Sequence, residues 1–289
     1  MSFAIFADSG SNLPRCILDT LGVEIIPFTL WINGEAHVCP RCPEDFDSHA
    51  FYEKMRNRAE VKTSLINSAV FEDAFRPALE AGKDVLYFSL SSGVSGTYHS
   101  ACLAAQELEE AFPERRVFVV DSLGAGCGTG LLACRAADAR AAGQSAEQAY
   151  RGVLADRDRL CEYFTVDDLM YLKRTGRVKA VVALAGTMLN IKPLLWGDPA
   201  GKISVYGKAR GRGKAIEAIA QKYRDKVVDP ERSRVFISHG DCPEDAQRLA
   251  DAVRQIAEPK ELIVVPHEPL TGAHVGPGML SLFFLGDGR

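Results

Sequence analysis

The segment Ser91–Tyr98, with the sequence Ser-Ser-Gly-Val-Ser-Gly-Thr-Tyr, is the strongest candidate for chemistry in the chain. It follows the apolar run Val85–Leu90 and precedes a helical pattern, so it is expected to connect a buried strand to a helix. Loops after parallel strands form a ligand crevice, and free N–H groups at a helix start attract anions. Ser95 and Gly96 therefore suit a carboxylate or phosphate, although an ordinary polar turn explains the segment equally well. Thr97 stands where the Gly-x-Ser-x-Gly elbow of hydrolases has its last glycine, which excludes that motif.

Three other loops carry small hydroxyl residues in similar positions. Asp8–Asn12 follows the first apolar run, Asp121–Gly124 follows another, and Lys62–Ser64 lies in a polar stretch before a helical pattern. Because parallel strands end at the same edge of a sheet, several of these loops could face one crevice. Each loop taken singly is more often a helix cap or a turn than a ligand contact.

One histidine and one arginine are further candidates for polar contacts. His274 stands in Gly272–Gly278, where closely spaced Gly and Pro residues impose a defined backbone around the imidazole. Arg177 follows Asp167–Gly176, which is interpreted as a short helix ended by glycine, and its guanidinium could bind a carboxylate or phosphate. The alternatives are a structural histidine and a cation that complements a helix dipole.

Nucleotide sites are disfavoured by residue spacing. A P-loop ending at Lys214 needs glycine at position 208 and Ser or Thr at position 215, where the chain has Lys208 and Ala215. The alternating glycines of the segment 124–130 do not fit the Gly-x-Gly-x-x-Gly pattern either. The basic segment Lys208–Lys214 is interpreted as a solvated turn, with contact to an anionic partner as the alternative. We therefore expect no bound cofactor.

The cysteines point to reduced thiols. Eight cysteines are scattered through the chain without a recognisable secretion signal, so most are expected to be buried and reduced. Cys39 and Cys42 form one Cys-x-x-Cys pair, but a second pair or a nearby pair of histidines is missing. A plain loop or a chance redox pair is therefore favoured over a metal site.

Composition restricts the class of protein. The chain has 289 residues and a net charge of −4, from 34 Lys and Arg against 38 Asp and Glu. This mild imbalance argues against a nucleic-acid partner. Apolar residues make up 47%, as in an ordinary globular protein, yet no apolar run is long enough to span a bilayer. We expect a cytoplasmic protein without an integral membrane segment.

The elements that must position these residues alternate between strand-length apolar runs and amphipathic helical patterns. Continuous apolar runs are typical of strands covered on both faces, and the alternation predicts parallel strands with helices on both sides. Strands are predicted at Phe3–Ala7, Val85–Leu90, Val117–Val120, Val235–Ser238 and Leu262–Val265, and helices at about 68–81, 96–110 and Pro243–Ile256.

Two segments depart from this alternation. Gly22–Val38 predicts two strands joined by a tight turn at Asn33 and Gly34, and Lys192–Arg210 predicts another pair with a turn at Asp198–Gly201. A helix-rich stretch separates the halves. We therefore expect two α/β domains, residues 1–160 with a mostly parallel sheet and residues 161–289 with a mixed sheet.

Taken together, the motifs resemble those of the DegV family of bacterial fatty-acid-binding proteins. The Ser-Gly-Thr-Tyr loop and the His-x-Gly-Pro-Gly ending are the most specific of them, and the matches span almost the whole chain. They are, in order, Asp8–Ser9, Lys62–Ser64, Ser91–Tyr98, Asp121–Ser122, Leu172–Arg174 with Gly176–Arg177, Lys192–Leu194 and His274–Gly278.

The resemblance implies a non-catalytic protein that holds one long-chain fatty acid with its carboxylate at the domain junction. It implies that Thr63 and Ser95 donate hydroxyl hydrogen bonds to the carboxylate with help from the Gly96 amide, and that His274 belongs to the same polar network. Arg177 matches an arginine near the head group or the partner surface. Such proteins present the acid to a separate ATP-dependent kinase, which converts it to an acyl phosphate.

Some features leave substrate preference and chemistry open. Leu65 stands where the family often has Gln, and Thr175 where it often has Gly. The alternative function is a serine-type hydrolase or acyltransferase with Ser95 as nucleophile and His274 as base. An acyl tail needs an apolar channel. Core packing explains each of the apolar residues predicted to line this channel equally well. The predicted lining residues are Phe28, Leu30, Leu169, Leu189, Phe283 and Phe284.

Overall fold

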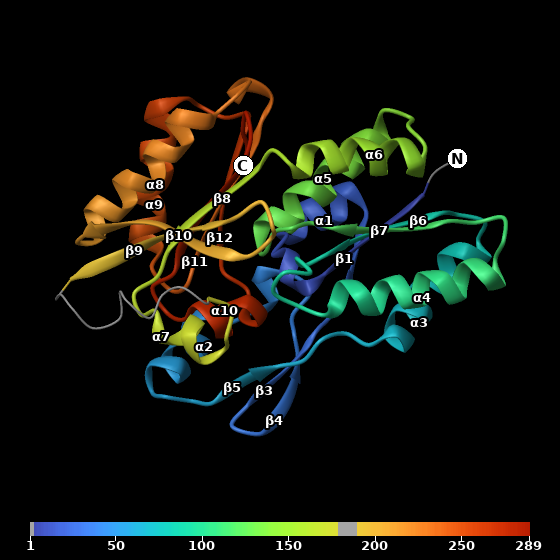
Figure 1. Cartoon of the computed structure of the whole chain (residues 1–289), viewed down its shortest axis with the longest axis horizontal. Coiled ribbons are helices and arrows are strands. Elements are labelled where there is room, and N and C mark those ends of the chain that lie inside the picture. Colours follow the sequence, from blue (N-terminus) through green and yellow to red (C-terminus); the bar gives the residue numbers. More distant parts are fainter. Residues whose placement is uncertain (1–2, 179–189) are drawn as a thin grey trace.

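The computed structural model describes residues 3–178 and 190–289, and these residues form three β-sheets (Figure 1). The first is a four-stranded sheet in the order β2-β1-β6-β7, and every neighbouring pair is parallel. The central strands β1 and β6 are buried on both faces, as their continuous apolar sequences predict. The strands are β1 Ala4–Asp8, β2 Val23–Ile26, β6 Val85–Ser89 and β7 Val117–Asp121.

Helices cover both faces of this parallel sheet. Figure 1 shows α5 and α6 on one side and α3 and α4 on the other. The Asn67 side chain caps α3 by accepting a hydrogen bond from the Val70 amide, and Ser145 and Gln148 form a capping box on α6. The helices of this half are α1 Arg15–Leu21, α2 Ser48–Arg56, α3 Ser68–Glu80, α4 Thr97–Ala111, α5 Cys127–Ala141 and α6 Ala146–Arg157.

A small antiparallel sheet lies below the parallel sheet in Figure 1, in the order β4-β3-β5. It consists of β3 Thr29–Ile32, β4 Glu35–Val38 and β5 Val61–Thr63. The tight turn predicted at Asn33 and Gly34 is confirmed, with φ angles of 52° and 88°. The prediction of two strands for Gly22–Val38 is wrong, because its first apolar run forms β2 and pairs with β1, so the segment contains three strands.

The third sheet has six strands in the order β10-β9-β8-β13-β11-β12. Only β11 and β12 are parallel neighbours, so the mixed sheet expected for this half is confirmed. Helices α8 and α9 pack on one face. The elements are β8 Leu160–Thr165, α7 Met170–Arg174, β9 Ile191–Gly197, β10 Ile203–Arg210, α8 Arg212–Lys226, β11 Arg234–His239, α9 Pro243–Ile256, β12 Glu261–Pro266, α10 Pro269–Val275 and β13 Leu280–Leu285.

Helix α5 joins the parallel and the mixed sheet into one core. Leu131 and Leu132 of this helix share a cluster of buried side chains with Phe236, Val265 and Phe283 of the mixed sheet. The same helix packs against β1 and β6 of the parallel sheet. The domain boundary at residue 160 stays a prediction, although β8 begins there.

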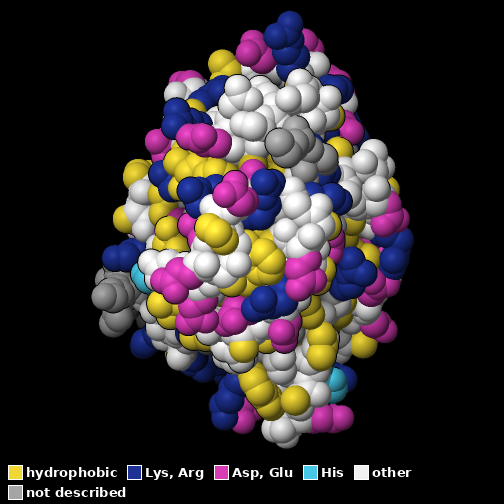
Figure 2. Space-filling view, turned by 90° about the vertical axis from the view of Figure 1, so that its right-hand side faces the viewer, with side chains coloured by type: hydrophobic (Ala, Val, Ile, Leu, Met, Phe, Trp, Pro, Cys, Tyr) yellow, Lys and Arg dark blue, Asp and Glu magenta, His cyan; other side chains and the backbone are white. Residues whose placement is uncertain are grey.

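Other expectations concern the surface and the cysteines. Within residues 3–178 and 190–289, no helix is long and apolar enough to cross a membrane. Figure 2 shows acidic and basic side chains interspersed over the face that it presents. All eight cysteines are free thiols, and burial raises the pKa of Cys42 to about 11. Its thiol donates to Asp45, so the Cys39–Cys42 pair belongs to a packed loop.

Candidate functional site

A pocket of about 540 Å³ lies between the loops at the carboxyl edge of the parallel sheet, helix α10 and one face of the mixed sheet. Its volume falls within the range of roughly 300–1,000 Å³ that small-molecule sites occupy. The pocket is closed on its inner side by buried residues such as Phe283, and its outer side reaches the surface at Leu65, which is 50% exposed. Thr63, Ser95, Gly96, Arg177 and His274 all line it.

Thr63 and His274 form one hydrogen-bonded pair on the wall of this pocket. Thr63 ends the edge strand β5, and His274 lies in the last turn of α10 instead of in a loop. Thr63 Oγ1 and His274 Nε2 are 2.9 Å apart. Burial, and then the nearby Arg177 charge, lower the pKa of His274 to about 4, so its ring is neutral at pH 7. When Nε2–H donates to Thr63, the threonine proton is free to point at a ligand.

Ser95 and Gly96 provide donors at the start of α4. Ser95 Oγ lies 2.9 Å from Thr97 Oγ1 and accepts the Thr97 amide at 3.3 Å. If Thr97 Oγ1 also donates to it, the Ser95 proton remains available to the pocket. Within the described residues the Gly96 amide has no hydrogen-bond partner, and it stands at the positive end of a 15-residue helix. These groups together suit an anion without any full positive charge.

The Asp8–Asn12 and Asp121–Gly124 loops stabilise the loop that carries Ser95 through hydrogen bonds to backbone amides. Buried Asp8 accepts hydrogen bonds from the amides of Gly10 and Leu90, at 3.0 and 2.9 Å. Asp121 accepts the amide of Ser92 at 3.0 Å, and so fixes the segment that carries Ser95. These contacts are those of turns and caps, although Leu123 and Gly124 of the Asp121–Gly124 loop also line the pocket.

Arg177 stands beside the pocket, just after the positive-φ residue Gly176. Gly176 has a φ of 72°, which favours glycine and ends the short helix as predicted. The Arg177 guanidinium donates to the Thr175 carbonyl and is half-buried. Its charge therefore acts on the His274 side of the pocket.

The inner wall contains a buried polar chain that sequence reasoning missed. His267 Nδ1 lies 2.8 Å from Ser238 Oγ, and its Nε2 lies 2.7 Å from Thr271 Oγ1. Ser238 also contacts Ser281 at 2.8 Å. Burial lowers the pKa of His267 to about 3, so its ring is neutral at pH 7. Ser238 and Ser281 are visible in the sequence only as short polar interruptions of the apolar strands β11 and β13.

Glu162 is a second missed residue on the same wall. It points from β8 into the pocket, is 6% exposed, and accepts a hydrogen bond from the Ala125 amide at 2.9 Å. Burial raises its pKa to about 7, although Arg289 acts in the opposite direction. A lone Glu in the apolar segment Leu160–Thr165 is the signal that could have revealed it.

The raised pKa of Glu162 predicts a pH-dependent effect of Glu162→Gln. Between the usual carboxyl pKa of 4.5 and about 7, the folded protein binds the proton more tightly than the unfolded chain does. Stability is therefore lost as pH rises through this window, and the cost persists above it. A glutamine side chain, which does not ionise, would not incur that cost. We therefore expect the free energy of unfolding of the variant, relative to that of the parent protein, to rise by on the order of 2 kcal/mol from pH 4 to pH 8.

Urea unfolding of both proteins at the two pH values measures this difference. An equal stability difference at pH 4 and pH 8 would contradict the assigned burial of the carboxyl.

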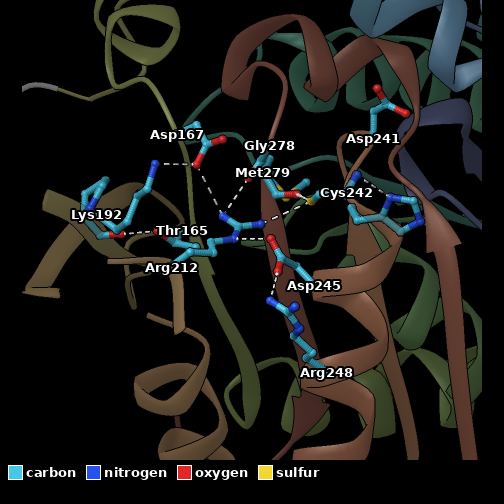
Figure 3. Close-up of polar contacts among 12 residues, drawn as sticks. Thr165, Asp167, Lys192, Arg212, Asp241, Cys242, Asp245, Arg248, Gly278 and Met279 are labelled. Carbon is cyan, nitrogen blue, oxygen red and sulfur yellow. Dashed lines mark hydrogen bonds and ion pairs between the residues drawn. The ribbon is translucent and has the colours of Figure 1, made fainter. Parts of the chain in front are cut away.

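A cluster of ion pairs braces the turn that follows His274 (Figure 3). Arg212 donates to the Gly278 carbonyl and to Asp245, both at 2.8 Å, and lies 3.7 Å from Asp167. Lys192 in turn pairs with Asp167 at 2.6 Å. The interpretation of Lys208–Lys214 as a solvated turn is therefore wrong, because the segment ends β10 and begins α8 with an inward-facing arginine.

The predicted lining residues divide according to strand alternation. Phe28 and Phe283 line the pocket. Phe284, adjacent in β13, points to the opposite face and packs with α8 and α9. Leu30 and Leu169 are not among the described residues that line the pocket, so their assignment to the lining is wrong; both pack in apolar clusters. Leu189 lies outside the described residues.

Ser95 and His274 lack the contact of a nucleophile and its base. His274 Nε2 is engaged by Thr63, and in the part of the chain that the structure describes its Nδ1 has no partner to orient the ring. A pKa of about 4 also makes the imidazole a weak base. The geometry therefore favours binding over hydrolysis.

Comparison with known proteins identifies relatives along the whole chain. The DegV family profile, described as an uncharacterised protein family, matches residues 2–287. A DegV domain-containing protein of Clostridium perfringens is 35% identical over 285 residues, which cover 99% of this chain and 98% of that protein. A second, from Streptococcus pyogenes, is 34% identical over 287 residues, covering 99% of both chains.

Solved structures show the same architecture. A DegV family protein of Thermus thermophilus, described by its fatty acid binding, has a TM-score of 0.89 and 30% identity, covering 99% of this chain and 100% of that one. A DegV lipid-binding protein of Thermotoga maritima has a TM-score of 0.87 and 28% identity over 100% of both chains. The sequence match over nearly the full length, together with this shared architecture, shows that the chain belongs to the DegV family.

Proposed function

We propose that this protein binds one long-chain fatty acid in the pocket, with the carboxylate held by Thr63, Ser95 and the Gly96 amide. The observation that carries the proposal is the combination of a largely apolar pocket with neutral donors at its accessible side. The solved relatives from Thermus thermophilus and Thermotoga maritima, described as fatty-acid- and lipid-binding, support it.

The energetics of such a ligand fit an enclosed apolar pocket. Burying a tail of about fourteen methylenes at about 0.8 kcal/mol each contributes about 11 kcal/mol before costs. Association costs about 4–15 kcal/mol, so most of the tail has to be buried for tight binding. Burying the carboxylate adds little affinity unless several hydrogen bonds replace those it made to water. In the proposed complex, Thr63, Ser95 and the Gly96 amide provide these hydrogen bonds.

The exposed side of the pocket suits presentation of the head group to a second protein. Gly96 and Leu65 are exposed, whereas Phe283 and His267 are buried at the inner wall. We infer that a separate ATP-dependent kinase transfers the terminal phosphoryl group of ATP to a carboxylate oxygen, giving an acyl phosphate and ADP. This protein supplies the bound acid and no catalytic group, and works in the cytoplasm where ATP is available.

Binding of the acid is tested by titrating delipidated protein with hexadecanoic acid in a calorimeter, with hexadecanol as the matched control. We expect one acid per chain and much weaker binding of the alcohol, which lacks the anion. Equal affinity for both lipids would refute the assigned carboxylate site.

Arg177→Ala is expected to impair acyl phosphate formation more than lipid binding. Arg177 lies beside the pocket but donates to the Thr175 carbonyl, so its charge is placed to act on the partner and the reacting phosphoryl group. Arg174→Ala is the control, because that exposed guanidinium lies 4.7 Å from the Tyr171 ring centroid and does not line the pocket. Equal losses in the binding and kinase assays would instead make Arg177 a carboxylate ligand.

A further inference from the structure

The Glu162 carboxyl occupies a space that three glycines leave open. A Cβ atom at Gly124, Gly128 or Gly197 would collide with its oxygens. These glycines come from the loop after β7, from α5 and from the end of β9, so three separate segments make room for one carboxyl group. The group therefore has a fixed place in the pocket wall.

The two oxygens of Glu162 have different surroundings. Oε1 accepts the Ala125 amide, so when Glu162 is protonated, as it is below its pKa of about 7, the proton lies on Oε2. Among the described residues no hydrogen bond reaches Oε2, which lies toward Gly197 in the pocket wall. Arg289, whose charge acts on Glu162, already donates to the carbonyls of Leu123 and Asp198, at 2.8 and 2.9 Å.

An unbranched hydrocarbon tail cannot satisfy this donor. Phe164 and Phe283 flank Glu162 on the same face of the sheet, so apolar side chains lie on both sides of the carboxyl group. Once a bound tail covers Oε2, an O–H without an acceptor costs free energy, whereas an oxygen on the ligand would remove that cost. A trapped water would also remove it, but such a water needs two or more polar partners of its own.

We propose that Glu162 makes the pocket selective for fatty acids that carry a second oxygen, as a hydroxyl or oxo group, along the acyl chain. The inference rests on the proposed fatty acid site and specifies its substrate class. The carboxylate stays with Thr63 and Ser95, while the chain oxygen accepts the Glu162 proton as a hydrogen bond.

The test compares octadecanoic acid with hydroxyoctadecanoic acids that carry the hydroxyl in the middle or at the far end of the chain. Delipidated protein should bind at least one hydroxy acid about tenfold more tightly than octadecanoic acid. Glu162→Leu, which removes the donor at similar size, should lose or invert this preference. Glu162→Gln, which keeps a donor, should retain part of it.

The outcomes separate this inference from the proposed function. Binding of octadecanoic acid without any preference, or an unchanged preference in Glu162→Leu, overturns the role of Glu162 alone. Failure of every acid to bind overturns the proposed function itself. If Glu162→Leu does not fold, the preference of the parent protein and of Glu162→Gln still decides the question.

Discussion

Replacing Thr63 by Val is expected to weaken binding of hexadecanoic acid about tenfold to a hundredfold. Valine keeps the shape of threonine but removes the hydroxyl that pairs with His274 at 2.9 Å and is directed at the proposed carboxylate. A hydrogen bond to a charged group contributes about 1.5–3 kcal/mol, which corresponds to that loss of affinity. The histidine also loses a buried partner, which adds to the effect.

Ser95→Ala should produce a similar loss, and Ser92→Ala supplies the matched control. Ser92 lies in the same loop and also lines the pocket, but its hydroxyl is already donated to Asp121. Calorimetric titration of the three variants should therefore show weak binding for Thr63→Val and Ser95→Ala and nearly unchanged binding for Ser92→Ala. A comparable loss in all three would mean that loop shape, and not the two donors, determines affinity.

Gly130→Ala and Gly152→Ala are expected to change stability in opposite directions. Both glycines lie inside helices, but a Cβ at Gly130 would lie 2.5 Å from the Ser11 carbonyl oxygen, while a Cβ at Gly152 meets nothing within 4 Å. Gly130→Ala should cost about 1–3 kcal/mol because α5 must move away from the backbone at Ser11.

Gly152→Ala should gain about 0.5–1 kcal/mol from reduced backbone entropy in the unfolded chain. Urea unfolding measures both changes. Stabilisation by Gly130→Ala would show that α5 is not held closely against the Ser9–Ser11 turn, and the joint core of the two large sheets would need another explanation.

Much of the fold could be predicted from the sequence, because its signals are local. The apolar run at Val85–Leu90 and the capped pattern from Asn67 specify a strand and a helix without reference to other segments. The role of β2 could not be predicted in this way, because its pairing with β1 depends on a distant partner. The order of strands in the mixed sheet depends on distant segments for the same reason.

Some residues of the candidate site could be predicted from the sequence, and others could not. Thr63, Ser95 and His274 could be singled out, because small hydroxyls and glycine-rich turns are visible in the sequence and in the family resemblance. Their placement around one pocket is a finding of the structure. Glu162 and His267 escaped notice because burial and partners, not residue type, give them their properties. The assignment of Phe284 to the lining failed because a single residue of register reverses which face it occupies.

Native mass spectrometry of the protein, purified without added lipid, tests most directly whether the pocket holds one ionised acyl chain. We predict a complex heavier than the bare chain by one fatty acid, which is released on denaturation and recovered in the organic extract. The Thr63→Val, Ser95→Ala double variant should lose most of it. Protein that is lipid-free and also takes up no long-chain acid when one is supplied would contradict the proposed function.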